Sequence, residues 1–107
     1  MDSFELALSD LNKAIEMDPQ QSGAYMNRGD VYLKQNLNDL ALKDFNKAMG
    51  IIADRDDPFI SVTKAKIYLR LKNYDKAWAE LNKYKKLNVY IDKEFLDQLK
   101  KESGREQ

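Results

Sequence analysis

An internal repeat constrains this chain more than any other feature of its sequence. The segment DLNKAI at positions 10–15 returns as DFNKAM at 44–49, and a third copy, ELNKYK, follows at 80–85. The copies are therefore 34 and 36 residues apart. A period of this size is typical of proteins that stack small helical units, each of which buries its apolar face against its neighbours. The repeat indicates an all-α architecture.

Apolar residues within each copy return at intervals of three and four positions, which is the spacing of one helix face. Polar turns at 36–39 and 72–75 separate paired helices. Asp2 or Ser3 is expected to cap the first helix, and Asp57 to cap the fourth. Asp18-Pro19 is expected to end the first helix, because a residue before proline avoids the helical region. The expected helices cover residues 4–17, 24–35, 39–52, 58–71, 75–87 and 92–101.

The helix faces predict which side chains are buried. Gly29 costs about 1 kcal/mol relative to alanine inside a helix, so we expect the backbone of a neighbouring helix to approach it closely. Tyr84 is expected on the core face of its helix. The third helix is expected to bury Leu40, Ala41, Phe45, Ala48, Met49 and Ile52. The last helix is expected to turn Ile91, Phe95, Leu96 and Leu99 inward.

The motif Y-x2-R-G-x2-Y at 25–32, followed by A-x3-F-x2-A at 41–48, resembles the tetratricopeptide repeat (TPR). Arg28 stands where that family usually has leucine, and Ala53 replaces the closing proline. The third copy departs from the pattern at Ser61, Lys64 and Tyr84. The resemblance covers about residues 3–88, and it implies a right-handed TPR α-solenoid of about 2.5 helix-turn-helix repeats followed by a C-terminal capping helix.

This register predicts a single TPR domain over residues 1–103. It consists of a half repeat at 3–21, repeats at 22–55 and 56–89, a capping helix at 91–102 and a frayed tail at 104–107. The half repeat lacks its first helix, so we expect the chain to be a fragment of a longer protein. The N-terminus shows no signal peptide, and the default expectation for a complete protein would be the cytoplasm.

Composition argues against several classes of function. The chain has 18 basic and 18 acidic residues, whereas a nucleic-acid-binding domain usually has a basic excess. Without cysteine or histidine, the chain cannot form disulfides, thiolate nucleophiles or imidazole bases. The four glycines are scattered and make no phosphate-binding loop. We therefore expect no enzymatic activity, no cofactor and no membrane insertion, since no apolar run approaches the ~20 residues of a membrane span.

Two charged segments have compositions that could suit a binding site. The acidic loop with Asp54, Asp56 and Asp57 could offer oxygen ligands to a divalent cation, but it lacks the glycine and glutamate of a calcium-binding loop. A solvated connector is the favoured interpretation. The run Lys83-Tyr84-Lys85-Lys86 mixes basic and aromatic residues, as single-stranded nucleic-acid sites do. A solvated helix face is again favoured, because the net charge is zero.

The resemblance implies a protein or peptide partner, held in a concave groove lined by the first helix of each repeat. Leu33 and Leu69 are expected to be exposed there. Asn27 matches one residue of the TPR clamp for chaperone tails, but Phe59 and Thr63 stand where that clamp needs basic residues. The expected groove residues are Met26, Asn27, Asp30, Leu33, Lys34, Phe59, Val62, Thr63, Lys66, Leu69 and Arg70.

Self-association is the alternative function. The first predicted helix has an apolar face from Phe4 to Ile15, and the missing partner helix would leave part of this face uncovered. Uncovered apolar surface in a repeat protein can be buried by a second copy. The alternative is therefore a homo-oligomeric scaffold element, such as a homodimer, that assembles through the N-terminal half repeat.

Overall fold

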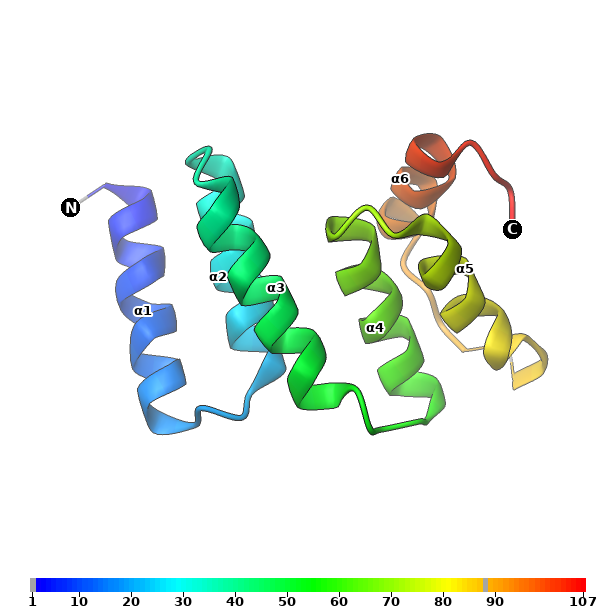
Figure 1. Ribbon diagram of the computed structural model, residues 1–107, viewed down its shortest axis with the longest axis horizontal. Helices are drawn as coiled ribbons and strands as arrows, with labels where there is room; N and C mark the ends of the chain where they lie inside the picture. The colour runs from blue at the N-terminus through cyan, green and yellow to red at the C-terminus, as the bar shows by residue number, and fades with distance from the viewer. Residues whose placement is uncertain (1, 88) are drawn as a thin grey trace. The chain divides into compact units, whose positions relative to one another are not determined.

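The computed structural model describes residues 2–87 and 89–107, and within these ranges it contains helices and no strand (Figure 1). The predicted domain and repeat limits also include residues 1 and 88, which lie outside the described residues. The all-α prediction is confirmed. The helices are α1 (Ser3–Met17), α2 (Ser22–Lys34), α3 (Asn38–Ile52), α4 (Pro58–Arg70), α5 (Tyr74–Lys83) and α6 (Lys93–Ser103), with a short 3-10 helix at Lys85–Leu87.

The chain divides into two compact units, unit 1 (Met1–Ala53) and unit 2 (Asp54–Gln107). Unit 1 holds α1, α2 and α3, and unit 2 holds α4, α5 and α6. In each unit the central feature is a hairpin of two helices, α2 with α3 and α4 with α5 (Figure 1).

Both predicted N-caps are confirmed. Asp2 Oδ1 accepts a hydrogen bond from the amide of Glu5 at 2.8 Å, and Asp57 Oδ1 accepts one from the amide of Ile60 at 3.0 Å. Pro58 follows Asp57 in the first turn of α4, where a missing amide proton costs nothing because that amide has no partner within the helix. These short sequence signals therefore position the start of α1 and of α4.

The two hairpins end in the same turn. Asn36 follows α2 and Lys72 follows α4, and both have positive φ, at 62° and 60°. The amide one residue after each of them donates to the carbonyl of Tyr32 or of Tyr68, at 2.8 and 2.9 Å. The turn geometry thus repeats at the 36-residue spacing, even though lysine, unlike asparagine, rarely adopts a left-handed conformation.

The core of unit 1 is built on a contact between α2 and α3. Phe45 is fully buried, and a Cβ atom added at Gly29 would lie 2.6 Å from Phe45 Cε1. The close approach expected at Gly29 is confirmed, but the approaching group is an aromatic ring and not a backbone. Glycine is needed here because any side chain would collide with that ring.

One residue of the predicted α3 face is misplaced. Leu40 is 45% exposed, so its predicted burial is wrong. Leu40 lies in the first turn of α3, one position before Ala41, which is the first buried residue of the helix. The residue four positions after Leu40, on the same side of the helix, is Asp44. The buried residues of α3 are Ala41, Asp44, Phe45, Ala48 and Ile52.

An ion pair crosses the α2–α3 hairpin. Arg28 Nε and Nη2 donate to the two carboxylate oxygens of Asp44, each at 2.8 Å, and Arg28 Nη1 donates to Asn12 Oδ1 of α1 at 2.9 Å. Asp44 is only 4% exposed, and the hydrogen bond with it raises the pKa of Arg28 above its ordinary value. A buried carboxylate needs such a partner, so Arg28 replaces the usual leucine with a specific junction of three helices.

Unit 2 has an apolar cluster where α6 lies against the α4–α5 hairpin. Phe95 and Leu99 of α6 are buried in it, and Ile91 and Leu96 pack partly against it, so the predicted inward face of the last helix is confirmed. Trp78 Nε1 donates to Ser103 Oγ at 3.0 Å, which fixes the end of α6 against α5. The buried members of the cluster are Ala65, Leu69, Ala77, Trp78, Leu81, Phe95 and Leu99.

Helix α5 ends four residues before its predicted end. The predicted helix ran to Leu87, but α5 stops at Lys83, and Tyr84 leaves the helical conformation with φ −117° and ψ 28°. Tyr84 is half-buried, and its hydroxyl donates to Asp56 Oδ1 at 2.8 Å, which raises the pKa of the hydroxyl. Its expected place on the core face is therefore wrong, because the ring turns toward the loop before α4.

Candidate binding surfaces

One face of α4 lines a cavity of about 230 Å³ in unit 2. The helix carries Phe59, Val62, Thr63 and Lys66 at intervals of three and one residues, which places them on neighbouring parts of one face. The segment before α6 completes the cavity with three further residues. These are Val89, Tyr90 and Asp92. We call this site the aromatic cavity.

Two exposed aromatic side chains flank the aromatic cavity. Phe59 and Tyr90 are each 83% exposed, although both are large and apolar in their ring atoms. Val62 differs from them because it also packs partly against the cluster of unit 2. The cavity therefore has a fixed floor and two free rings at its edge.

A salt bridge closes the polar side of the aromatic cavity. Lys66 Nζ lies 2.7 Å from Asp92 Oδ2, while Asp92 Oδ1 accepts the amide of Phe95 and caps α6. The bond from Lys66, with the helix cap second, lowers the pKa of Asp92 below its ordinary value. Lys66 also lies over the Phe95 ring, 5.7 Å from its centroid. This pair fixes the segment before α6 onto α4.

The structure brings together four of the six residues predicted from α4. Leu69 is not among them: it is 4% exposed and belongs to the buried cluster of unit 2, so its expected exposure is wrong. The physical reason is that Leu69 packs in a cluster with residues of both α5 and α6. Arg70 also lies outside the aromatic cavity, and its guanidinium donates to the carbonyl of Lys66 at 3.0 Å.

The predicted residues of unit 1 lie on α2. Leu33 is 39% exposed, in agreement with its expected exposure, and Asn27 and Lys34 are also exposed. Met26 and Asp30 are half-buried. The part of these α2 residues in binding stays a prediction.

Sequence reasoning missed Val89, Tyr90 and Asp92 as parts of a site. They lie in the connection between α5 and α6, where no helical period marks a face. The available signal was Tyr90 itself, a large aromatic residue in a stretch with no expected core role. The cap at Asp92 could also have placed this segment next to a helix start.

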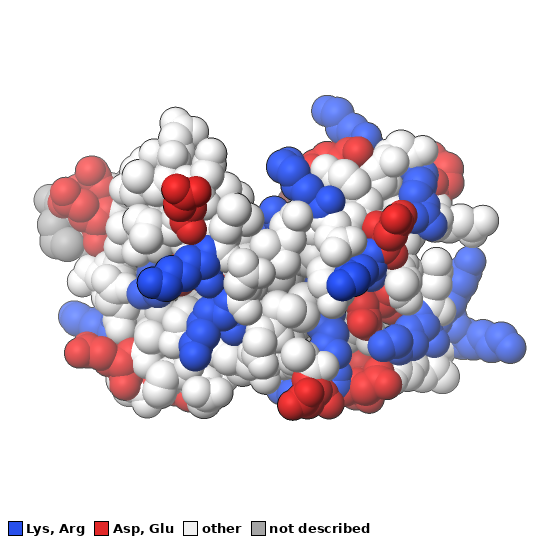
Figure 2. All heavy atoms as spheres, in the orientation of Figure 1, with Lys and Arg blue, Asp and Glu red and all other residues white. Residues whose placement is uncertain are grey.

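The charged segments have partners within unit 2. Asp56 accepts from Tyr84 and lies 3.4 Å from Lys83, and Asp57 caps α4. Among the described residues, no group of three or more side chains is placed to hold a metal ion. On the face in Figure 2, basic and acidic side chains are interspersed, and neither sign gathers into one large patch.

A family model for the tetratricopeptide repeat matches residues 22–55 and 60–88, which together are more than half of the chain. The chain belongs to the tetratricopeptide repeat family. The match confirms the resemblance, and it begins at the first residue of α2, as the predicted repeat does. No curated protein and no solved structure gives a significant match.

Tetratricopeptide repeats generally mediate protein–protein interaction and are typically non-catalytic. In this TPR protein, none of the described helices is long and apolar enough to cross a membrane. The second matched segment, residues 60–88, includes most of α4, the helix that lines the aromatic cavity.

Proposed function

We propose that this TPR protein binds a peptide or helix of a protein partner, and that the aromatic cavity of unit 2 is the anchoring site. The observation that carries the proposal is the pair Phe59 and Tyr90, both 83% exposed at the edge of a 230 Å³ cavity. Exposed aromatic side chains around a concave apolar site are typical of binding surfaces, since they give large contact areas at low cost in conformational entropy.

The cavity also indicates the chemistry of the partner. Its floor is Val62 and Val89, and its polar side is the Lys66–Asp92 pair. We infer that one large apolar side chain of the partner enters the cavity between the two rings, with polar residues on either side of it. An amphipathic helix or an extended segment with a single apolar anchor satisfies this requirement.

The exposed face of α2 is proposed as a second contact surface, on unit 1. Asn27, Leu33 and Lys34 offer an amide, an apolar side chain and a charge. Met26 and Asp30 flank them, and Thr63 and Arg70 remain proposed contacts on unit 2. Neither nucleic acid nor a membrane is proposed as the partner, because the chain has equal numbers of basic and acidic residues.

Selection of peptides from a random display library on the whole protein tests this proposal. Selected peptides should share an apolar anchor residue, and Phe59→Ala or Tyr90→Ala should weaken their binding by at least about tenfold. Leu87→Ala is the matched control, since Leu87 is 62% exposed in unit 2 but lies outside the aromatic cavity. Equal binding to all three variants would remove the aromatic cavity from the partner surface.

Self-association is a second candidate, favoured by the exposure of α1. No residue of α1 is buried, and Phe4 is 36% exposed. The half-buried Leu8, Leu11 and Ile15 could be covered by the same face of a second copy. Sedimentation from micromolar to millimolar concentration tests this: a dimer that Leu11→Glu abolishes supports it, and a monomer throughout contradicts it.

A further inference from the structure

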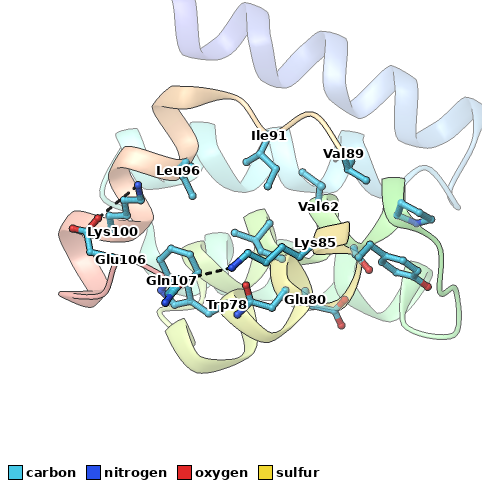
Figure 3. Close-up of a pocket in the computed structure, with 15 residues that line it drawn as sticks. Val62, Trp78, Glu80, Lys85, Val89, Ile91, Leu96, Lys100, Glu106 and Gln107 are labelled. Carbon is cyan, nitrogen blue, oxygen red and sulfur yellow. Dashed lines mark hydrogen bonds and ion pairs between the residues drawn. The ribbon is translucent and has the colours of Figure 1, made fainter. Parts of the chain in front are cut away.

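Unit 2 contains a second cavity, of about 360 Å³, between α4, α5 and the segments on either side of α6 (Figure 3). Trp78, Leu81 and Leu96 form apolar walls, and Glu80 and Ser61 add polar groups. We call it the Glu80 cavity. Its volume lies within the range of about 300–1,000 Å³ that is usual for ligand sites.

Two residues that line the Glu80 cavity each carry a buried polar atom with no hydrogen-bond partner. These atoms are Ser61 Oγ, in a residue that is 1% exposed, and Glu80 Oε2. The other carboxylate oxygen of Glu80, Oε1, accepts a hydrogen bond from Lys83 Nζ at 3.4 Å. Buried carboxylate and hydroxyl oxygens are nearly always hydrogen-bonded, and both of these atoms can accept. These two acceptors therefore lack a hydrogen-bond donor.

Unit 1 shows which donor completes the corresponding site. Asp44 lies 36 residues before Glu80 in the repeat, and it is held by both donors of the Arg28 fork at 2.8 Å. The residue 36 positions after Arg28 is Lys64, whose ammonium group instead donates to the carbonyl of Arg55. The carboxylate of the third repeat thus lacks the guanidinium that the second repeat supplies from its own chain.

Unit 2 also has no aromatic ring at the position that matches Tyr25 of unit 1. Tyr25 is buried in unit 1, and Arg28 lies over it at 5.6 Å from the ring centroid. The residue 36 positions later is Ser61, which is far smaller and lines the Glu80 cavity. Where a ring packs in unit 1, unit 2 therefore has only a hydroxymethyl group.

We propose that the Glu80 cavity binds the guanidinium group of an arginine side chain. The planar fork of a guanidinium suits a carboxylate better than an ammonium does. Glu80 Oε2 and Ser61 Oγ accept from it, and Trp78 packs against its stem. That a protein partner carries this arginine rests on the proposed function, whereas the recognition of guanidinium by the cavity does not.

Basic side chains at the cavity set its selectivity. Lys85 contacts Gln107 at 3.3 Å and Lys100 contacts Glu106 at 3.7 Å, as the dashed lines in Figure 3 mark. The positive charges of these two lysines repel every cationic ligand, so a positive charge alone is not enough for binding. Their contacts are exposed and weak, so the segment that carries Glu106 can give way when a ligand enters. The buried acceptors distinguish a guanidinium from an ammonium group, because a guanidinium presents several donors in one plane.

Trp78 gives a direct readout, because it is the single tryptophan of the chain and lines the cavity. We expect N-acetyl-arginine amide to change its fluorescence saturably. The neutral isostere N-acetyl-citrulline amide should bind at least tenfold more weakly. Glu80→Gln should weaken arginine binding at least tenfold, while Glu94→Gln, an exposed acid on α6, should leave it unchanged. Equal responses to arginine and citrulline, or full binding by Glu80→Gln, would overturn the proposal.

A second variant keeps the test informative if Glu80→Gln unfolds. Ser61→Tyr copies the residue of the second repeat and should fill the cavity, abolish the arginine response and raise the melting temperature. Arginine binding that survives this change would overturn the proposal. Phe59→Ala should leave arginine binding intact, so loss of peptide binding alone would contradict the proposed function and not this site.

Discussion

In unit 1 Gly29 lies under the ring of Phe45, and in unit 2 the residues 36 positions later are Ala65 and Leu81, both buried in one cluster. On the first helix of the hairpin, unit 2 has the methyl group of an alanine where unit 1 has a glycine. On the second helix, unit 2 has a leucine where unit 1 has a phenylalanine ring. Such exchanges conserve the packed volume and are tolerated well. At the apolar positions the two repeats therefore reach the same solution with different residues.

The polar residues at equivalent positions of the two repeats make different contacts. Arg28 and Asp44 form a bidentate pair in unit 1, whereas in unit 2 Lys64 donates to the carbonyl of Arg55 and Glu80 accepts from Lys83. Apolar packing needs only volume, but a buried carboxylate needs a donor in one direction and at one distance. The two repeats therefore share their apolar packing but not the ionic junction between their two helices.

The largest effect on stability is expected from removal of the buried ring of Tyr25. Tyr25→Ser would give unit 1 the residue that unit 2 has at this position, and would remove a buried ring together with the hydroxyl bond to the Pro19 carbonyl at 3.1 Å. We expect a loss of about 3–5 kcal/mol in the free energy of unfolding, measured by chemical denaturation. A loss below about 1 kcal/mol would mean that the ring does not fill this space.

A smaller effect is expected from exchanging the packing pair. Gly29→Ala should destabilise the protein by about 1–2 kcal/mol, because overpacking against Phe45 outweighs the better helix propensity of alanine. The double variant with Phe45→Leu copies unit 2 and should lose less than the two single variants together. A double-mutant cycle of unfolding free energies measures this coupling. Strict additivity would contradict the claim that the two pairs are equivalent.

The smallest effect is expected from acid titration of unit 2. The bond from Tyr84 lowers the pKa of Asp56, and the bond from Lys66 lowers the pKa of Asp92, both below the ordinary 3.8. A lowered folded-state pKa adds stability above the unfolded-state pKa, and this stability is lost as the pH falls through the folded-state value.

The double variant Asp56→Asn with Asp92→Asn removes both titrations, while asparagine can still cap α6. Its melting temperature, followed by circular dichroism from about pH 5 to pH 2, should therefore fall less than that of the unchanged protein. Parallel curves for the two proteins would show that neither bond contributes to stability in acid.

Much of the fold could be predicted because periodicity, caps and turn residues are local. Asp2, Asp57 and Gly29 each carried enough local chemistry to place a helix start or a close approach. Leu69 was misassigned because its burial depends on α6, which the pattern of α4 alone does not contain. Tyr84 was misassigned because its hydroxyl is drawn to Asp56, 28 residues earlier in the chain.

The candidate sites were less predictable than the helices. The four residues of α4 in the aromatic cavity follow from the repeat register, but Val89 and Tyr90 lie in a connection that has no period. The Glu80 cavity depends on a missing aromatic ring, since Ser61 occupies the position that Tyr25 has in the preceding repeat. A departure from the pattern at Ser61 was visible in the sequence, but the space and the unpaired oxygen beside it required the structure.

Paired neutralisation of the two register-matched acids tests the central claim most directly. We expect Asp44→Asn to lower the free energy of unfolding by about 3 kcal/mol, since it breaks a buried ion pair whose arginine is partly exposed. Glu80→Gln should change it by less than about 1 kcal/mol, since only a long pair with Lys83 is lost. Equal losses from the two variants would contradict the claim that only the second repeat completes its ionic junction.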